Sequence, residues 1–193
     1  MPSMLAVMLL TLSAFVQTAA QQDFKPEPGL PGKDAVWVPT SPALVEKMLD
    51  LAKVTKDDFV IDLGSGDGRM VIAAAKRGAR ALGVEYNPQL VQLSRRLAKE
   101  AGVEARATFV EGDMYEADIS KATVLALFLL PENLRRLEPK FRALSPGTRI
   151  VVNSFGIPDW TADETEQITE NCTSWCTAIL YRIQPPAKSR SFR

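Results

Sequence analysis

The sequence predicts an α/β fold of the doubly wound kind, with a mostly parallel sheet and helices on both faces. A short apolar run at residues 59–63 precedes a glycine-rich turn and a helix-like stretch at residues 70–76, which together form the first half of a βαβ unit. Apolar runs and helical patterns then alternate along the chain. The run at residues 122–130 is continuously apolar, as expected for a central strand buried on both faces. Such folds bind ligands outside the carboxyl ends of their strands.

The other elements follow from local patterns. Ser41 is placed to cap a helix with Pro42 in its first turn, and apolar residues recur at helical spacing through residues 42–53. A helix is expected to begin at residues 131–138, where Pro139 would break or restart it. Residues 154–172, by contrast, are polar and poorly periodic. Further strands are expected at residues 80–85, 107–111, 149–153 and 177–183, the last antiparallel at one edge, and a further helix at residues 88–101.

The two ends of the chain differ from the central part. Residues 1–20 carry no charged side chain and contain an apolar stretch, which fits either a signal-like leader of an exported, periplasmic protein or an anchor that holds the domain in the cytoplasm. Residues 21–35 are rich in proline and glycine and are expected to form a linker. The predicted domain is 36–184, and residues 185–193 are expected to be a disordered tail.

Composition excludes several kinds of chemistry. The chain has 193 residues, 23 basic and 23 acidic side chains, and no histidine. Catalysis by a histidine base and zinc sites with histidine ligands are therefore excluded, and no metal is expected. Net neutrality gives no indication of a nucleic-acid partner. Cys172 and Cys176 are predicted to be small apolar core residues, although in an exported protein they could pair.

The glycine turn predicts a cofactor site. Gly64, Gly66 and Gly68 permit a close approach to the backbone, and the following helix begins where an anion would be stabilised. Arg69 stands where a dinucleotide fingerprint requires glycine, and no Gly-Lys-Ser/Thr motif of phosphate-binding loops is present. The pattern that begins at Asp62 instead resembles motif I of class I methyltransferases that use S-adenosylmethionine (SAM). The turn, with Ser65, could then seat the cofactor's carboxylate on its amides, and Asp62 could offset the ammonium.

Two more acidic residues extend this resemblance. Glu85 ends the second strand about 20 residues beyond the turn, where an acid holds a ribose diol. Asp113 follows the third strand, where the family pattern implies an acid that accepts from the adenine amino group. Met114 could pack on the adenine ring, and Tyr86 and Tyr115 are expected to pack on the cofactor.

A closer resemblance rests on Val38-Pro39-Thr40 and Phe128-Leu-Leu-Pro131. With motif I, these segments resemble the small bacterial and mitochondrial protein-lysine methyltransferases related to the ATP synthase c-subunit lysine methyltransferase. The resemblance implies methylation of a protein lysine with SAM as cofactor. A seven-stranded Rossmann-like sheet with an antiparallel edge strand, methyl transfer by in-line displacement and a monomer are expected, and the N-terminal segment could place the protein near a membrane. A small-molecule methyltransferase and a non-catalytic SAM-binding module at a membrane are the alternatives. No catalytic base is assigned. The candidate substrate or lid residues are Trp37, Pro39, Thr40, Leu130 and Pro131.

Overall fold

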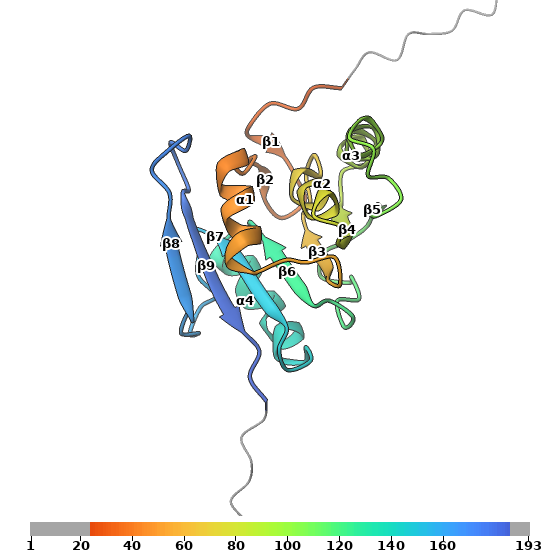
Figure 1. Ribbon diagram of the computed structural model, residues 1–193. Helices are drawn as coiled ribbons and strands as arrows, with labels where there is room; N and C mark the ends of the chain where they lie inside the picture. Colours follow the sequence, from red (N-terminus) through yellow and green to blue (C-terminus); the bar gives the residue numbers. More distant parts are fainter. Residues whose placement is uncertain (1–23, 186–193) are drawn as a thin grey trace, which may run out of the picture.

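The computed structural model describes residues 24–185 (Figure 1). The leader predicted at residues 1–20 and nearly all of the tail predicted at 185–193 lie outside this range. Within it, no helix combines the length and the apolar character needed to cross a membrane.

A seven-stranded sheet forms the centre of the domain and confirms the predicted fold class. Its five parallel strands run from one edge in the order β5-β4-β3-β6-β7, and β9 and then β8 complete the other edge. The strand β9 pairs antiparallel with both β7 and β8. The bounds are β3 Phe59–Leu63, β4 Arg80–Glu85, β5 Ala107–Glu111, β6 Val124–Leu127, β7 Arg149–Asn153, β8 Glu164–Gln167 and β9 Thr177–Arg182.

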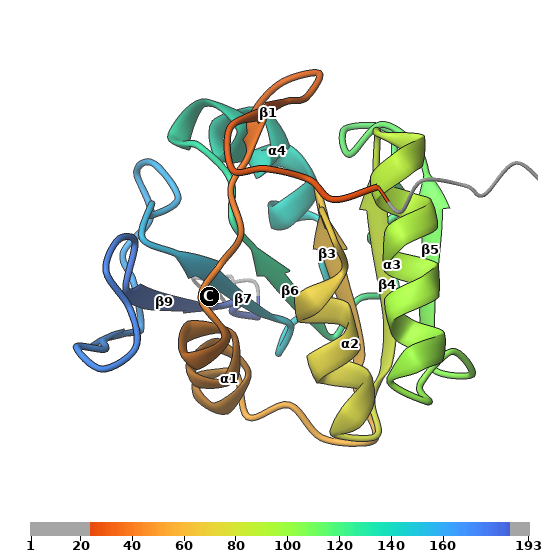
Figure 2. The same cartoon turned by 90° about the horizontal axis from the view of Figure 1, so that it is seen from above.

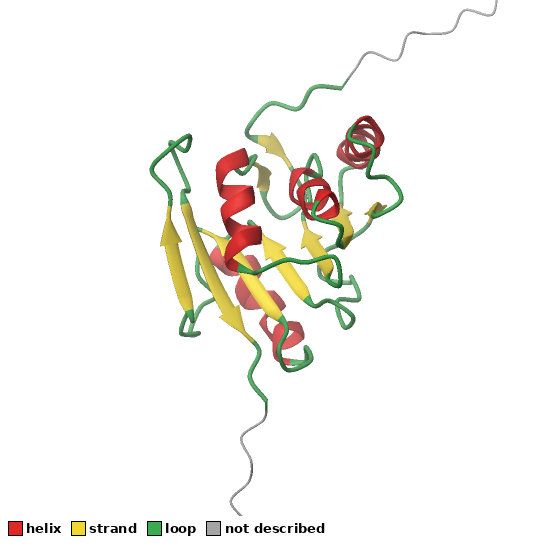
Figure 3. Ribbon diagram, viewed as in Figure 1, coloured by secondary structure: helices red, strands yellow, loops and turns green. Residues whose placement is uncertain are grey.

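Four helices cover the two faces of the sheet. The helices α1 (Pro42–Leu51), α2 (Arg69–Lys76) and α3 (Pro88–Glu100) lie on one face, and α4 (Pro131–Arg142) lies on the other (Figures 1 and 3). Neighbouring residues of a strand point to opposite faces, so the central strands supply apolar side chains to both cores. In β3, for example, Val60 packs with the first core and Ile61 with the second. This is the reason why the central strands are continuously apolar.

The strand β8 and the helix α4 differ from the sequence predictions. The strand β8 consists of four exposed polar residues, Glu164–Gln167, and it rather than β9 forms the edge of the sheet. Nothing in its side-chain pattern marks it, because neither of its faces is buried. The helix α4 continues through Pro139 to Arg142. Pro139 lies on the exposed side, while buried Leu137 and Phe141 hold the last turns against the core.

The prediction that Cys172 and Cys176 are free core residues is wrong. The two cysteines form a disulfide in the loop between β8 and β9, with their Cα atoms 5.8 Å apart. A regular strand would separate residues four apart by about 13 Å. The loop avoids this because Asn171 and Trp175 adopt left-handed backbone conformations, with φ of 55° and 54°, and so turn the chain back on itself.

The predicted linker also contains structure. Leu30–Pro31 (β1) pairs antiparallel with Val36–Trp37 (β2) and forms a short hairpin. Figure 2 shows this hairpin beside α4, and Asp34 at its tip lies 4.0 Å from Arg136 of that helix. The proline and glycine content of the segment, interpreted as a linker, thus includes the tight turn of a hairpin.

One charged network fastens the opposite end of the sheet. The carboxylate of Asp58, which is buried, accepts hydrogen bonds from the backbone N–H of Thr55 (2.8 Å), the hydroxyl of Thr123 (2.7 Å) and the guanidinium of Arg149. Burial alone would raise the pKa of Asp58, but these donors more than offset it and lower the pKa below its usual value. The network joins the segment before β3 to the starts of β6 and β7.

Candidate functional site

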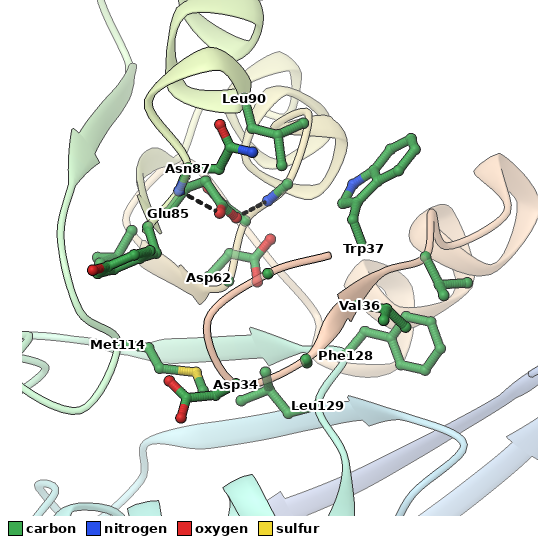
Figure 4. Close-up of a pocket in the computed structure, with 18 of the residues that line it drawn as sticks. Asp34, Val36, Trp37, Asp62, Glu85, Asn87, Leu90, Met114, Phe128 and Leu129 are labelled. Carbon is green, nitrogen blue, oxygen red and sulfur yellow. Dashed lines mark hydrogen bonds between the residues drawn. The ribbon is translucent and has the colours of Figure 1, made fainter. Parts of the chain in front are cut away.

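A pocket lies along the carboxyl ends of the parallel strands, under the hairpin (Figure 4). Residues 30–40, which comprise the hairpin and the segment that follows it, form its cover. The turns after β3, β4 and β5 form one half of the wall, and the segments after β6 and β7 form the other. This is where a doubly wound sheet is expected to bind its ligand.

The glycine turn is shaped by close packing on both sides. Gly64, Gly66 and Gly68 have φ of 74°, 56° and 80°, a region that glycine adopts without strain. A Cβ on Gly66 would lie 2.3 Å from the indole nitrogen of Trp37, so the indole packs directly on the turn. Gly68 does not line the pocket. It packs instead against the ring of Phe109, which a Cβ would meet at 2.6 Å.

Four amides of this turn are used within the protein, which leaves fewer of them to seat the cofactor's carboxylate than the sequence suggested. The N–H groups of Gly64 and Ser65 both donate to the carbonyl of Val84, at 2.8 and 3.1 Å. The N–H of Gly66 donates to the carboxylate of Glu85, and that of Gly68 to the carbonyl of Ser65. A carboxylate in the pocket would therefore gain from a further donor.

Arg69, at the start of α2, is positioned to be that donor. It lines the pocket, pairs with Asp67 and donates from Nη1 to the backbone carbonyl of Thr40 at 2.7 Å. A guanidinium has five N–H donors, so these bonds leave some unused. The sequence drew attention to Arg69 only as a missing glycine. The structure shows that it ties the glycine turn to the segment containing Pro39 and Thr40.

Asp62 is a buried carboxylate that faces the pocket at the end of β3 (Figure 4). Burial raises its pKa well above the usual value, and the nearby carboxylates of Glu85 and Asp67 raise it further. No side-chain hydrogen bond to it occurs among residues 24–185. The Ser65 hydroxyl close by is likewise buried without a partner. A cation with N–H donors, such as an amino acid's ammonium, would satisfy such a carboxylate.

Glu85 is held with its carboxylate toward the pocket. One oxygen accepts the N–H of Gly66 at 2.8 Å and the other that of Asn87 at 2.9 Å (Figure 4). A carboxylate has about four lone-pair positions, so each oxygen can accept one more hydrogen bond. Two acceptors side by side fit the two hydroxyls of a ribose.

Lys33, which the sequence did not single out as a site residue, closes the outer end of the pocket by pairing with Asp113. Asp113 accepts the N–H of Tyr115 on one oxygen and the Lys33 ammonium on the other, at 2.5 Å. The hydrogen bond from Lys33, more than that from Tyr115, lowers the pKa of Asp113. Lys33 also lies over the ring of Tyr86, 5.2 Å from its centroid. The hairpin is thus tied to the residues expected to surround an adenine, including the buried Met114.

The candidate substrate or lid residues separate into two groups. Trp37, Pro39, Thr40 and Leu130 line the pocket, whereas Pro131 starts α4 outside it. The expectation that Tyr115 packs on the cofactor is wrong, because its ring lies in the core. Its hydroxyl accepts from the Asn133 amide at 2.8 Å, and the Arg136 guanidinium lies 3.6 Å from the ring centroid.

The half of the pocket beyond β6 and β7 is aromatic. Phe128 follows β6, Phe155 follows β7, and their ring centroids are 6.3 Å apart. Trp175, from the disulfide loop, lies 5.9 Å from Phe128. None of these three side chains carries a charge, so this half contrasts with the carboxylate-lined half. Val36 and Leu130 complete this wall, and both are exposed.

Together, the sheet order, the glycine turn and the three acids at successive strand ends define a class I methyltransferase with SAM as its cofactor. A family model described as the ANTKMT methyltransferase domain matches residues 62–164. The chain belongs to this family.

Individual relatives agree with that assignment. A protein-lysine N-methyltransferase of Saccharolobus islandicus is 42% identical over 150 residues, covering 76% of this chain and 92% of that protein. The mouse ATP synthase c-subunit lysine N-methyltransferase is 38% identical over 130 residues, covering 67% of this chain and 52% of that protein, so the match spans about half of the mouse enzyme. A solved structure described as an RNA methyltransferase from Salinibacter ruber, with S-adenosyl-L-homocysteine bound, has a TM-score of 0.73 at 41% identity and covers 81% of this chain and 100% of that one.

Proposed function

We propose that the protein transfers the methyl group of SAM to the side-chain amine of a lysine in a protein. The observation that carries the proposal is the continuity of one pocket from a carboxylate-lined half to an aromatic half. The first half suits the donor and the second suits an alkyl amine, so donor and acceptor would meet inside one cavity. The names of the Saccharolobus and mouse relatives support lysine as the acceptor.

The donor half offers a partner for each polar part of SAM. Asp62 would hold the ammonium, Arg69 the carboxylate and Glu85 the ribose hydroxyls. Asp113 would accept from the adenine amino group, and Met114 would pack on the ring. Of the other predicted cofactor residues, Gly64, Ser65, Gly66 and Tyr86 line the same half, and Gly68 would act by shaping the turn.

Bound SAM would supply an electrophilic methyl group. A neutral lysine amine would attack this carbon in line with the C–S bond, which would break to leave S-adenosyl-L-homocysteine, and the methylated amine would lose its proton to water. The contribution of this chain is placement and desolvation. Trp37 packs on the glycine turn and Leu130 lines the aromatic half, and a fixed approach of the amine can supply much of the rate acceleration. The rings of Phe128 and Phe155 exclude water. Desolvation lowers the pKa of a lysine, so the aromatic half favours the neutral amine that must attack.

RNA is the second candidate acceptor, because the Salinibacter protein is described as an RNA methyltransferase. This chain has a net charge of zero, so it lacks the excess of basic side chains that is typical of proteins that bind RNA. The experiment is to incubate the purified full-length chain and methyl-labelled SAM with protein extract, with extract whose lysines have been blocked by acetylation, with total RNA, and with the small-molecule fraction of the extract.

We expect label in protein bands and its loss when lysines are blocked. Glu85→Ala should strongly reduce the signal at limiting SAM, while Glu111→Ala, at the matching exposed position of the neighbouring strand, should not. Label in RNA or in a small molecule would overturn the lysine assignment. A chain that binds S-adenosyl-L-homocysteine but labels nothing would support the non-catalytic module instead.

A further inference from the structure

Trp175 has an unusual combination of conformation and exposure. It is a bulky residue in the left-handed region, with φ of 54°, where side chains other than glycine are uncommon. Its side chain is 46% exposed and is not part of either hydrophobic core. Burial therefore does not account for this conformation. Strain of this kind is retained where the surrounding structure fixes it, and it gathers at functional sites.

The loop that carries Trp175 is closed in two ways. The Cys172–Cys176 disulfide closes its second half. The N–H of Ile168 donates to the carbonyl of Cys176 at 2.9 Å, which fixes the loop to the ends of β8 and β9. Trp175 immediately precedes Cys176, so the covalent link restricts the backbone that sets the direction of the indole. The loop contributes Trp175 to the wall of the pocket.

The position of the indole determines which part of a ligand it could contact. The carboxylates that fit the cofactor end three strands on one side, β3, β4 and β5. Trp175 lies on the other side, 5.9 Å from Phe128, which in turn stacks on Phe155. Three aromatic rings from three separate segments thus surround the mouth opposite the donor half. Rings in this arrangement contact an alkyl chain along their faces.

We propose that Trp175, held by the Cys172–Cys176 loop, determines acceptor specificity by forming the outer wall of a channel for the lysine side chain. This inference rests on the proposed function. The alkyl stem lies along the faces of Trp175 and Phe128, and the amine reaches past Phe155 toward the methyl group. When the loop is opened, the chain keeps its cofactor site and loses the outer wall of the acceptor channel.

The test compares two readouts on the full-length chain. S-adenosyl-L-homocysteine binding by calorimetry reports on the donor half, and methyl transfer from labelled SAM to protein extract reports on the acceptor half. The variants are Trp175→Ala, Trp175→Phe and the double variant Cys172→Ser with Cys176→Ser. Ser174→Ala is the control, because Ser174 is exposed in the same loop and does not line the pocket.

We expect all four variants to bind S-adenosyl-L-homocysteine within about twofold of the wild type, which also shows that they fold. Transfer to protein should fall by about tenfold or more in Trp175→Ala and in the double cysteine variant, as for the loss of an aromatic anchor at a binding surface. Trp175→Phe should retain much of the wild-type transfer activity, and Ser174→Ala should retain all of it.

The outcomes distinguish this inference from the proposed function. A wild-type chain that labels lysines, with Trp175→Ala equally active, would overturn the role of Trp175 and leave the proposed function intact. Full activity of the double cysteine variant would overturn the role of the disulfide. Label in RNA or in a small molecule, but in no protein, would overturn both the proposed function and this inference.

Discussion

Replacing Glu85 by alanine should weaken cofactor binding by an amount that the structure predicts. In the structure the carboxylate accepts two backbone N–H groups and has lone pairs left for two ribose hydroxyls. A hydrogen bond to a charged group is worth about 1.5 to 3 kcal/mol. Loss of two such bonds, at the lower end of that range, weakens binding by about 3 kcal/mol, or roughly 150-fold in Kd. Calorimetry with S-adenosyl-L-homocysteine measures this directly.

Two further variants make the test of Glu85 specific. Glu85→Gln keeps the shape but only one acceptor oxygen, so its affinity should fall between those of the wild type and Glu85→Ala. Glu111→Ala removes a carboxylate from the paired position of β5, outside the pocket, and should bind normally. If Glu85→Ala bound the ligand within about threefold of the wild type, the assignment of two ribose hydrogen bonds, and the magnitude built on it, would be refuted.

Three other predictions concern the turn and two carboxylates. Gly66→Ala should destabilise the protein by more than the 1–2 kcal/mol or so of a left-handed alanine, because its Cβ meets an indole at 2.3 Å. Thermal unfolding measures the loss, and Gly102→Ala is the control. Gly102 has φ of 67° and an added Cβ there would meet no atom within 4 Å, so this variant gives the backbone contribution alone. The raised pKa of Asp62 means that the folded state binds more protons than the unfolded state, so stability falls as pH rises through that pKa. Asp62→Asn should therefore raise the ligand-free Tm at neutral pH, an advantage that disappears in acid, while weakening S-adenosyl-L-homocysteine binding. A lower Tm at neutral pH would contradict this. Asp58 has a lowered pKa, so its stabilisation is present at neutral pH and is lost as pH falls through the folded-state pKa. Asp58→Ala should reduce the free energy of unfolding by about 3 kcal/mol at pH 7 and by less in acid, and an equal loss at both pH values would contradict the linkage.

The parts of the fold that the sequence predicted are those in which local pattern and burial coincide. The strands β3 and β6 are apolar because both faces of the sheet are covered, and the glycine turn is marked by residues that permit left-handed conformations. The carboxylates of Asp62 and Glu85 could be placed because strand ends meet at one edge of the sheet.

The parts that the sequence did not predict depend on contacts between distant segments. The strand β8 is defined by its pairing with β9 and has no buried face. Lys33 lies in a segment that resembles a linker and acquires its role only by meeting Asp113. The disulfide required a loop geometry that spacing alone does not reveal. Arg69 could have been found by asking what an arginine at a helix start would bind.

The order of the pocket's residues along the chain has a consequence for how such enzymes diversify. The carboxylates of the donor half come from one continuous stretch of sequence, from Asp62 to Asp113, although Lys33 and Trp37 of the hairpin also border this half. The three rings of the aromatic half come from later segments, the last of which is a surface loop with its own covalent closure. Exchange of that loop would change the proposed acceptor wall without altering the carboxylates proposed to bind SAM. A methyltransferase of this kind could therefore acquire a new methylation target by a change in one hairpin loop. The residues proposed to bind the methyl donor would stay the same.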